Sequence, residues 1–101
     1  MAINAYLQDI HGKKERKVCD LHYCLARLWP IGDKSFPLLQ YIDPYGNVIF
    51  NGIQMAEVER ELDILLERCS SQEQKEVVGA IRELAKKGQD TPHLYLRFRG
   101  D

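Results

Sequence analysis

The sequence predicts an α+β fold of order β-α-β-β-α-α-β, with a four-stranded, mainly antiparallel sheet, an αα-hairpin and a further helix packed mostly on one face. Three observations lead to this prediction. Polar and apolar residues alternate near both ends of the chain, two stripes of helical period follow one another between positions 51 and 88, and a turn-rich segment spans 36–54. The 101 residues are predicted to form one globular domain, 1–101.

The first third of the chain is predicted to hold one strand and one helix. Residues 2–10 alternate imperfectly between polar and apolar types, which is typical of a half-buried strand. Residues 11–17 are polar and basic, and we expect a connection there. Apolar residues then recur at helical spacing from Val18 to Leu28, so a helix is expected over this range, ended by Pro30. A strand is the alternative for the same segment.

The segment FPLLQYIDPYGNVIFNGIQ, residues 36–54, predicts a β-hairpin followed by a helix start. We expect strands over 38–42 and 48–50. The turn between them, 43–47, contains a Pro that presets φ, an Asp whose carboxylate can accept backbone N–H groups, and a Gly that tolerates positive φ. The Asp, the Pro and the Gly of this turn therefore each have a structural reason to be where they are.

Two helices and a strand are predicted for the C-terminal half. Asn51 and Gln54 have the spacing of a capping box, and the first helix is expected to end near Cys69. The Ser pair at 70–71 begins the second helix, for which Gly88 is the expected C′ residue. The final strand is expected over 93–99, where Leu and Phe alternate with polar residues.

Composition and charge exclude several classes of protein. The formal net charge is −1, so no global field draws the chain to nucleic acid or to anionic lipid. No apolar run is long enough to cross a membrane, and the N-terminus lacks the features of a secretory signal. Three cysteines, an odd number, are expected to be reduced thiols. We therefore expect a cytoplasmic protein that does not bind membranes.

Metal-type ligands cluster at one place only, Cys19, His22 and Cys24. Zinc sites need about four ligands, and no second pair accompanies these three, so we predict no metal and no cofactor. A cysteine nucleophile would need a base beside it, and the sequence orders none there. No catalytic residue is predicted.

Acidic residues and a turn tyrosine are candidates for binding a partner. The predicted helix after Asn51 carries a run of carboxylates, in which Glu57 and Glu61 could belong to an acidic docking surface for a basic partner. A solvated helix face is the plainer reading of the same residues. At the 43–47 turn, the Asp43 carboxylate is expected to accept backbone N–H groups. Tyr45 has no evident structural role and resembles the aromatic residues that are enriched at protein interfaces.

Basic residues suggest an alternative. A basic run at 13–17 and a strand face made of His93, Tyr95, Arg97 and Arg99 could contact single-stranded nucleic acid. In that reading Tyr95 stacks on a base and Arg97 contacts phosphate. A solvated sheet face is the competing explanation.

The 36–54 segment and the C-terminal HLYLRFRGD resemble a group of small uncharacterised bacterial α+β proteins with an FPxLxYxDxYG…FNxxQ segment and an HLYLxFxGD strand. The matching residues are Phe36, Pro37, Asp43, Tyr45, Gly46, Phe50, Asn51, Gln54, Leu96, Phe98, Gly100 and Asp101. The resemblance implies no specific activity. It implies a small cytoplasmic domain of the kind found as immunity proteins or accessory binders beside bacterial toxins.

The leading expectation is thus a noncatalytic protein-binding domain, of immunity or accessory type, whose partner is another protein. The alternative is a nucleic-acid-associated regulator that uses the basic run and the basic-aromatic strand face. A small hydrolase-like enzyme built on Asp43 and Tyr45 comes third. A homodimer is a further option, because a short edge strand can pair across a two-fold axis.

Overall fold

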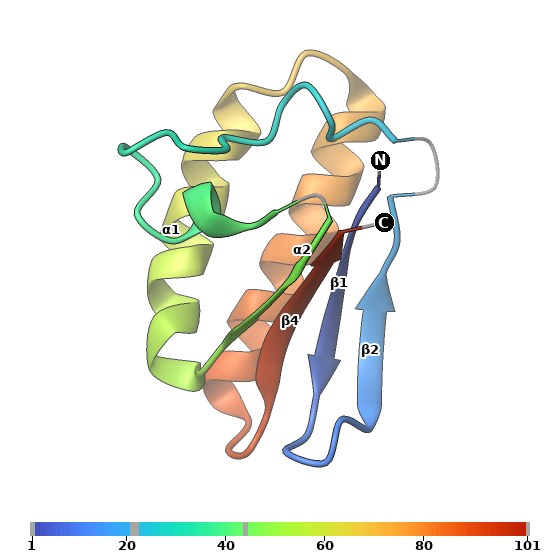
Figure 1. The fold of residues 1–101 in the computed structure, drawn as a ribbon, viewed down its shortest axis with the longest axis vertical. Coiled ribbons are helices and arrows are strands. Elements are labelled where there is room, and N and C mark those ends of the chain that lie inside the picture. The colour runs from blue at the N-terminus through green and yellow to red at the C-terminus, as the bar shows by residue number, and fades with distance from the viewer. Residues whose placement is uncertain (1, 21–22, 44, 101) are drawn as a thin grey trace.

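A computed structural model describes residues 2–20, 23–43 and 45–100 of the chain (Figure 1). It confirms the α+β class, with a four-stranded antiparallel sheet and an αα-hairpin. The elements in chain order are β1 (Ile3–Gln8), β2 (Lys14–Val18), the 3-10 helix η1 (Leu39–Tyr41), β3 (Asn47–Phe50), α1 (Gly52–Glu67), α2 (Gln72–Asp90) and β4 (Tyr95–Gly100).

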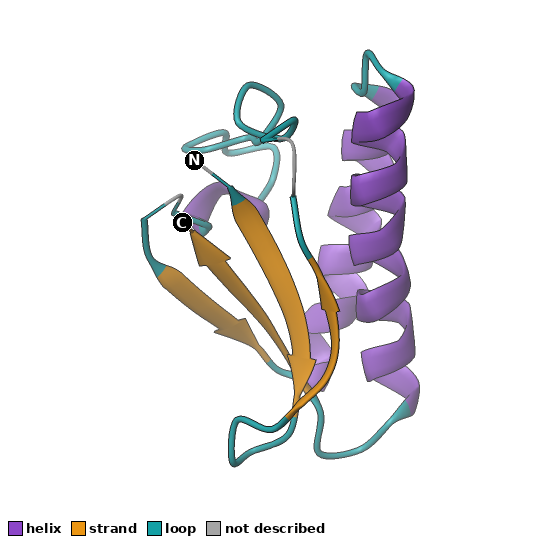
Figure 2. Cartoon of the chain, turned by 90° about the vertical axis from the view of Figure 1, so that its right-hand side faces the viewer, coloured by secondary structure: helices purple, strands orange, loops and turns teal. Residues whose placement is uncertain are grey.

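The sheet has the order β2-β1-β4-β3, and all neighbouring strands are antiparallel. Helices α1 and α2 pack side by side against one face of this sheet (Figure 2). The opposite face is turned to the viewer in Figure 1, and no helix of the described residues covers it. The described part of the segment between β2 and β3 runs across the end of the sheet where the two termini lie. The fold therefore has one covered and one open sheet face.

The core lies between the covered sheet face and the helices. Leu7 on β1, Phe98 on β4 and Ile81 on α2 are all buried. The segment before β3 contributes too, since the Trp29 ring centroid lies 5.9 Å from that of Phe98 and the Trp29 Nε1–H donates to the Leu39 carbonyl at 3.1 Å. The described part of the segment between β2 and β3, most of which is irregular, thus covers one end of the core.

Residues 14–18 form strand β2, so the expected polar connection over 11–17 is wrong for most of its length. β2 is an edge strand whose side chains are exposed except for half-buried Val18, and it therefore lacks the apolar alternation that marks a strand. Its charged residues protect the edge against pairing with other chains. The Asp9 carboxylate forms the turn before it by accepting the His11 and Lys13 N–H groups at 2.9 and 2.8 Å.

The helix expected over 18–28 is not formed in the described part of that range, 18–20 and 23–28. Val18 belongs to β2, and the buried Asp20 side chain then closes a series of turns. Its carboxylate accepts the N–H groups of Cys24 at 2.9 Å and Leu25 at 3.2 Å. A side chain that competes for backbone donors favours turns over a helix. Of the expected helical stripe, Leu21 lies outside the described residues.

The strand expected over 38–42 is also wrong, because residues 39–41 form η1. Phe36 and Leu39 are buried at a spacing of three, which suits a 3-10 turn. The 43–47 turn is present, with the Gly46 N–H donating to the Asp43 carbonyl at 3.1 Å, although Pro44 lies outside the described residues. This turn leads from η1 into β3, whose partner is β4, so the expected hairpin does not form.

The starts of both helices are confirmed. Asn51 and Gln54 form the capping box of α1, with both hydrogen bonds at 2.9 Å, and Ser71 caps α2. Gly88 is not the C′ residue, because α2 continues to Asp90 and Gly88 packs inside it against Met55. Neither helix is apolar over a length that would cross a bilayer, among the residues described.

Candidate functional site: the open face of the sheet

Three cross-strand rows of side chains make up the open face of the sheet. Ala5 and Leu7 point into the core, so Asn4, Tyr6 and Gln8 point to the open side of β1. The register then defines the rows, which are Lys17–Tyr6–Arg97–Ile49, Lys14–Gln8–Tyr95 and Asn4–Arg99–Asn47. We call these ten residues the open face. Side chains in one row lie within contact distance of their neighbours.

Four of these ten residues are basic, namely Lys14, Lys17, Arg97 and Arg99, and Glu15 at the bulge of β2 adds one carboxylate beside Lys14. Among the described residues none of the four has a carboxylate within ion-pair distance. The Lys14 Nζ lies 4.4 Å from the centroid of the Tyr6 ring, and Arg97 donates to the Asn47 Oδ1 at 2.8 and 3.1 Å. Lys14 and Arg97 are thus held in place by neutral partners.

The helix layer carries the opposite charge. Glu57 pairs with Arg60 at 2.6 Å, while Arg82 of α2 bridges Glu59 at 3.4 Å and Asp63. These pairs neutralise much of the acidic stripe of α1. The molecule therefore combines a net charge near zero with a locally positive sheet face.

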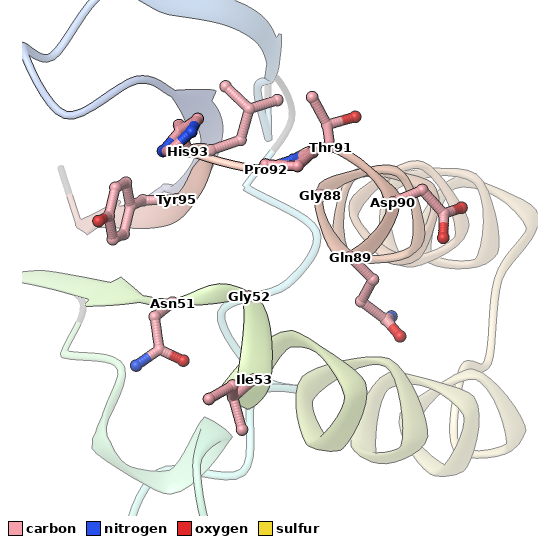
Figure 3. A pocket seen from close by; sticks show the side chains of 11 residues that line it. Asn51, Gly52, Ile53, Gly88, Gln89, Asp90, Thr91, Pro92, His93 and Tyr95 are labelled. Atoms are coloured by element: carbon pink, nitrogen blue, oxygen red, sulfur yellow. The ribbon is translucent and has the colours of Figure 1, made fainter.

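Tyr95 borders two hollows at the β1–β2 turn end of the open face. One is a hollow of about 200 Å³ lined by Gln8, Asp9, Ile10, Ile49 and Tyr95. The other is a cleft of about 570 Å³ between the start of α1 and the end of α2, lined by residues that include Asn51, Ile53 and His93 (Figure 3). His93 has a φ of 71°, an unusual conformation for a non-glycine residue. A half-buried aromatic ring thus stands between two concave surfaces.

Tyr95 and Arg97, two of the predicted site residues, lie on the open face, and β1 separates their strand from Lys14 and Lys17 of β2 on the same face. His93 precedes β4 and lines the cleft. Glu57 is half-buried, and hydrogen bonds from Arg60 lower the pKa of its carboxyl group. It lies on α1, on the opposite side of the sheet from the other two.

Glu61 is fully buried, so its assignment to an exposed acidic face is wrong. Its Oε1 accepts the Leu38 N–H at 3.0 Å and the Leu39 N–H at 2.9 Å. Burial, and then the neighbouring Glu57, raise the pKa of this carboxyl to about 7. Glu61 joins α1 to the start of η1 and is not accessible to a partner.

Asp43 and Tyr45 lie in the turn that precedes the first residue of β3. The Asp43 carboxylate accepts the Tyr45 N–H at 2.7 Å, so the hydrogen bond expected within this turn is present. The Tyr45 side chain is 78% exposed. The Gly100 N–H donates to the Gly46 carbonyl at 2.8 Å, so this turn is attached to the end of β4 beside the Asn4–Arg99–Asn47 row.

Cys24 is a poor candidate for a nucleophile. Burial and the adjacent Asp20 raise the pKa of the Cys24 thiol to about 11, which disfavours the thiolate needed by a nucleophile. Among the described residues no group of three or more His, Cys, Asp or Glu is placed to hold a metal ion. His22, one of the three clustered ligands, lies outside the described residues.

Sequence reasoning missed Tyr6, Gln8, Lys14 and Lys17 as members of a common surface. Lys14 and Lys17 belong to the basic run that had been assigned to a connection. Residues 13–17 are all charged, so this segment shows no alternation of polar and apolar residues that would identify an edge strand. Only the pairing of β1 with both β2 and β4 brings the two basic segments together.

No family model, no curated protein and no solved structure matches this chain.

Proposed function

We propose that the protein is a noncatalytic module that binds single-stranded nucleic acid on the open face. The observation that carries the proposal is the position of Lys14, Lys17, Arg97 and Arg99 on one uncovered sheet face, where none of the four forms an ion pair with a described carboxylate. Phosphate contacts supply most of the affinity of such proteins, and they come from basic side chains. Of the expectations drawn from the sequence, the nucleic-acid alternative is therefore the one that the geometry supports best.

The spacing of these side chains suits an extended strand. Lys17 and Arg97 flank Tyr6 in one row, which separates them by about 10 Å, twice the distance between neighbouring strands. Arg97 and Arg99 follow one another along β4 at about 7 Å. Because Lys14 already covers the Tyr6 ring, Tyr95 is the aromatic ring on this face best placed to stack on a base.

The test is fluorescence anisotropy with labelled 12-nucleotide RNA and DNA single strands and a duplex of the same sequence. We expect binding of the single strands that weakens with salt, with a slope of log K against log[salt] near −3 for about four phosphate contacts. Replacing Arg97→Gln and Arg99→Gln together should reduce both the affinity and the slope. The matched control is Lys75→Gln with Lys86→Gln on α2, which removes the same charge from the helix layer.

The control variant is expected to bind as the unaltered protein does. Equal losses in the two double variants would show that net charge, and not the open face, governs binding. Absence of any binding at about 50 mM salt would remove the proposal, since electrostatic binding is strongest at low ionic strength.

A second candidate is a noncatalytic protein-binding domain of immunity or accessory type. The exposed Tyr45, held on a turn by Asp43, favours it, because exposed tyrosines are enriched at the centres of protein interfaces. The test is quantitative mass spectrometry of proteins that co-purify with the tagged chain and with its Tyr45→Ser variant. One abundant partner lost on substitution supports this function, and identical protein profiles contradict it.

A further inference from the structure

The hollow beside Tyr95 is lined by two polar and three apolar residues. Gln8 and Asp9 supply the polar groups, and Ile10, Ile49 and the Tyr95 ring supply the apolar surface. Ile10 and Ile49 are 72% and 53% exposed, so both walls are accessible. Its volume of about 200 Å³ is sufficient for one small ring system and too small for an extended chain.

Gln8 has an unsatisfied hydrogen-bonding group. Its side chain is more than nine-tenths buried, at 7% exposure, and its Oε1 has no hydrogen-bond partner among the described residues. Gln8 lies between Lys14 and Tyr95 in its row, and Lys14 is stacked on Tyr6. A buried acceptor without a donor costs free energy. A ligand that brings a donor to Oε1 recovers that cost once the Lys14 side chain moves, while the Tyr95 ring stays in place as a wall of the hollow.

Asp9 determines which part of a nucleotide can enter. Its Oδ1 accepts the His11 and Lys13 N–H groups, which fixes the carboxylate at the rim of the hollow. A carboxylate repels phosphate, so the phosphates are expected along the basic rows and not here. Gln8 Oε1 and the Asp9 carboxylate are both acceptors. The hollow therefore favours a ligand that presents N–H groups.

We propose that this hollow is a subsite for one base that carries an exocyclic amino group, with cytosine as the simplest case. The inference rests on the proposed binding of single strands. The base stacks on Tyr95, and its amino group donates to Gln8 Oε1 and the Asp9 carboxylate. Uracil has a carbonyl oxygen at the position of that amino group, and two acceptors facing each other repel.

The test compares oligocytidylate and oligouridylate 12-mers by anisotropy at one salt concentration. Both carry the same number of phosphates, so the electrostatic contribution cancels in the ratio of affinities. We expect about fivefold tighter binding of oligocytidylate, the effect of about one hydrogen bond. In Asp9→Asn the turn bonds can persist while the amide adds a donor, so the ratio should fall to about one. Gln8→Met, which removes the acceptor, should lower the ratio as well.

The two proposals fail in different ways. If the unaltered protein binds both oligonucleotides equally, or uridylate more tightly, the subsite is wrong and the nucleic-acid-binding function stands. If it binds neither at low salt, the function itself is wrong. A cytidylate preference that survives unchanged in folded Asp9→Asn would also overturn the assignment, with circular dichroism confirming that the variant is folded.

Discussion

The Oε1 of Glu61 lies 2.9 Å from the backbone nitrogen of Leu39 and accepts its N–H. This contact joins the middle of α1 to the short helix η1, 22 residues earlier in the chain. The same oxygen accepts the Leu38 N–H, so one buried carboxylate satisfies two donors at the start of η1. On the other side of η1, the Leu39 carbonyl accepts the Trp29 indole N–H. Irregular chain is thereby held against the core from two directions.

Glu61 makes stability depend on pH. Its pKa is raised from 4.5 to about 7 in the folded protein, so the folded state binds a proton more tightly than the unfolded state. The contribution is fully present below about pH 4.5 and is lost as pH rises through about 7. Between pH 5 and pH 8 we expect Glu61 to lower the free energy of unfolding by on the order of 2 kcal/mol. Glu61→Gln should remove most of this decrease, as measured by urea denaturation at both pH values. Identical pH profiles of the two proteins would contradict the assignment.

Removing the Glu61 side chain should release the η1 segment. Glu61→Ala leaves two backbone donors without an acceptor, so we expect a loss of about 1–3 kcal/mol in the free energy of unfolding. Trp29 is the only tryptophan, and its emission should shift to the red because the segment that it anchors loosens. The control is Glu67→Ala, which removes an exposed carboxylate from the same helix and should cost less than about 1 kcal/mol. Equal losses in the two variants would argue against this role of Glu61.

Two glycines of α2 are expected to respond oppositely to alanine. A Cβ at Gly88 would meet the Met55 Sδ and lie 3.0 Å from the Leu7 Cδ1, so Gly88→Ala overfills the core. We expect a net destabilisation of about 1–2 kcal/mol after the gain in helix propensity. A Cβ at Gly79 would meet nothing within 4 Å, so Gly79→Ala should stabilise by about 0.5–1 kcal/mol. Thermal denaturation measures both, and shifts in Tm of the same sign would contradict the packing described for Gly88.

Cys24 should be slow to react with alkylating reagents. With a pKa of about 11 its thiolate is scarce at neutral pH, and the thiolate is the reactive species. We expect modification by iodoacetamide at pH 7.5 to be at least about tenfold slower than in the urea-unfolded chain. Peptide mass spectrometry over time follows Cys24 separately from the other two cysteines. Equal rates of Cys24 alkylation in the folded and the unfolded protein would show that neither burial nor the hydrogen bond from the thiol to the Asp20 carboxylate protects Cys24.

Local signals predicted β1, β3, β4 and the starts of both α-helices. The capping residues Asn51 and Ser71 mark the starts of α1 and α2, because a cap interacts only with the next few residues. Alternation predicted β1 and β4, which have one face in the core. The end of α2 was predicted too early, since Gly88 is explained by its contact with Met55 and not by a turn.

The segment between β2 and β3 could not be predicted in the same way. Its apolar residues were assigned to a helix and a strand, yet the described part forms turns and η1. Asp20 and Glu61 decide this conformation by accepting backbone N–H groups. Glu61 lies far along the chain from η1, so no local pattern reveals the contact. The spacing of apolar residues does not reveal a buried carboxylate that accepts backbone N–H groups in place of a regular helix or strand.

The sequence by itself determined the α+β class, the two capped helices, and Tyr95 and Arg97 as members of a basic-aromatic strand face. These follow from interactions between residues a few positions apart. Only the tertiary structure decided that Lys14 and Lys17 lie on the same face and that the Glu61 side chain is buried. The pairing of β1 with two strands and the burial of a carboxylate against a distant segment are long-range contacts, whose geometry exists only once the chain is folded.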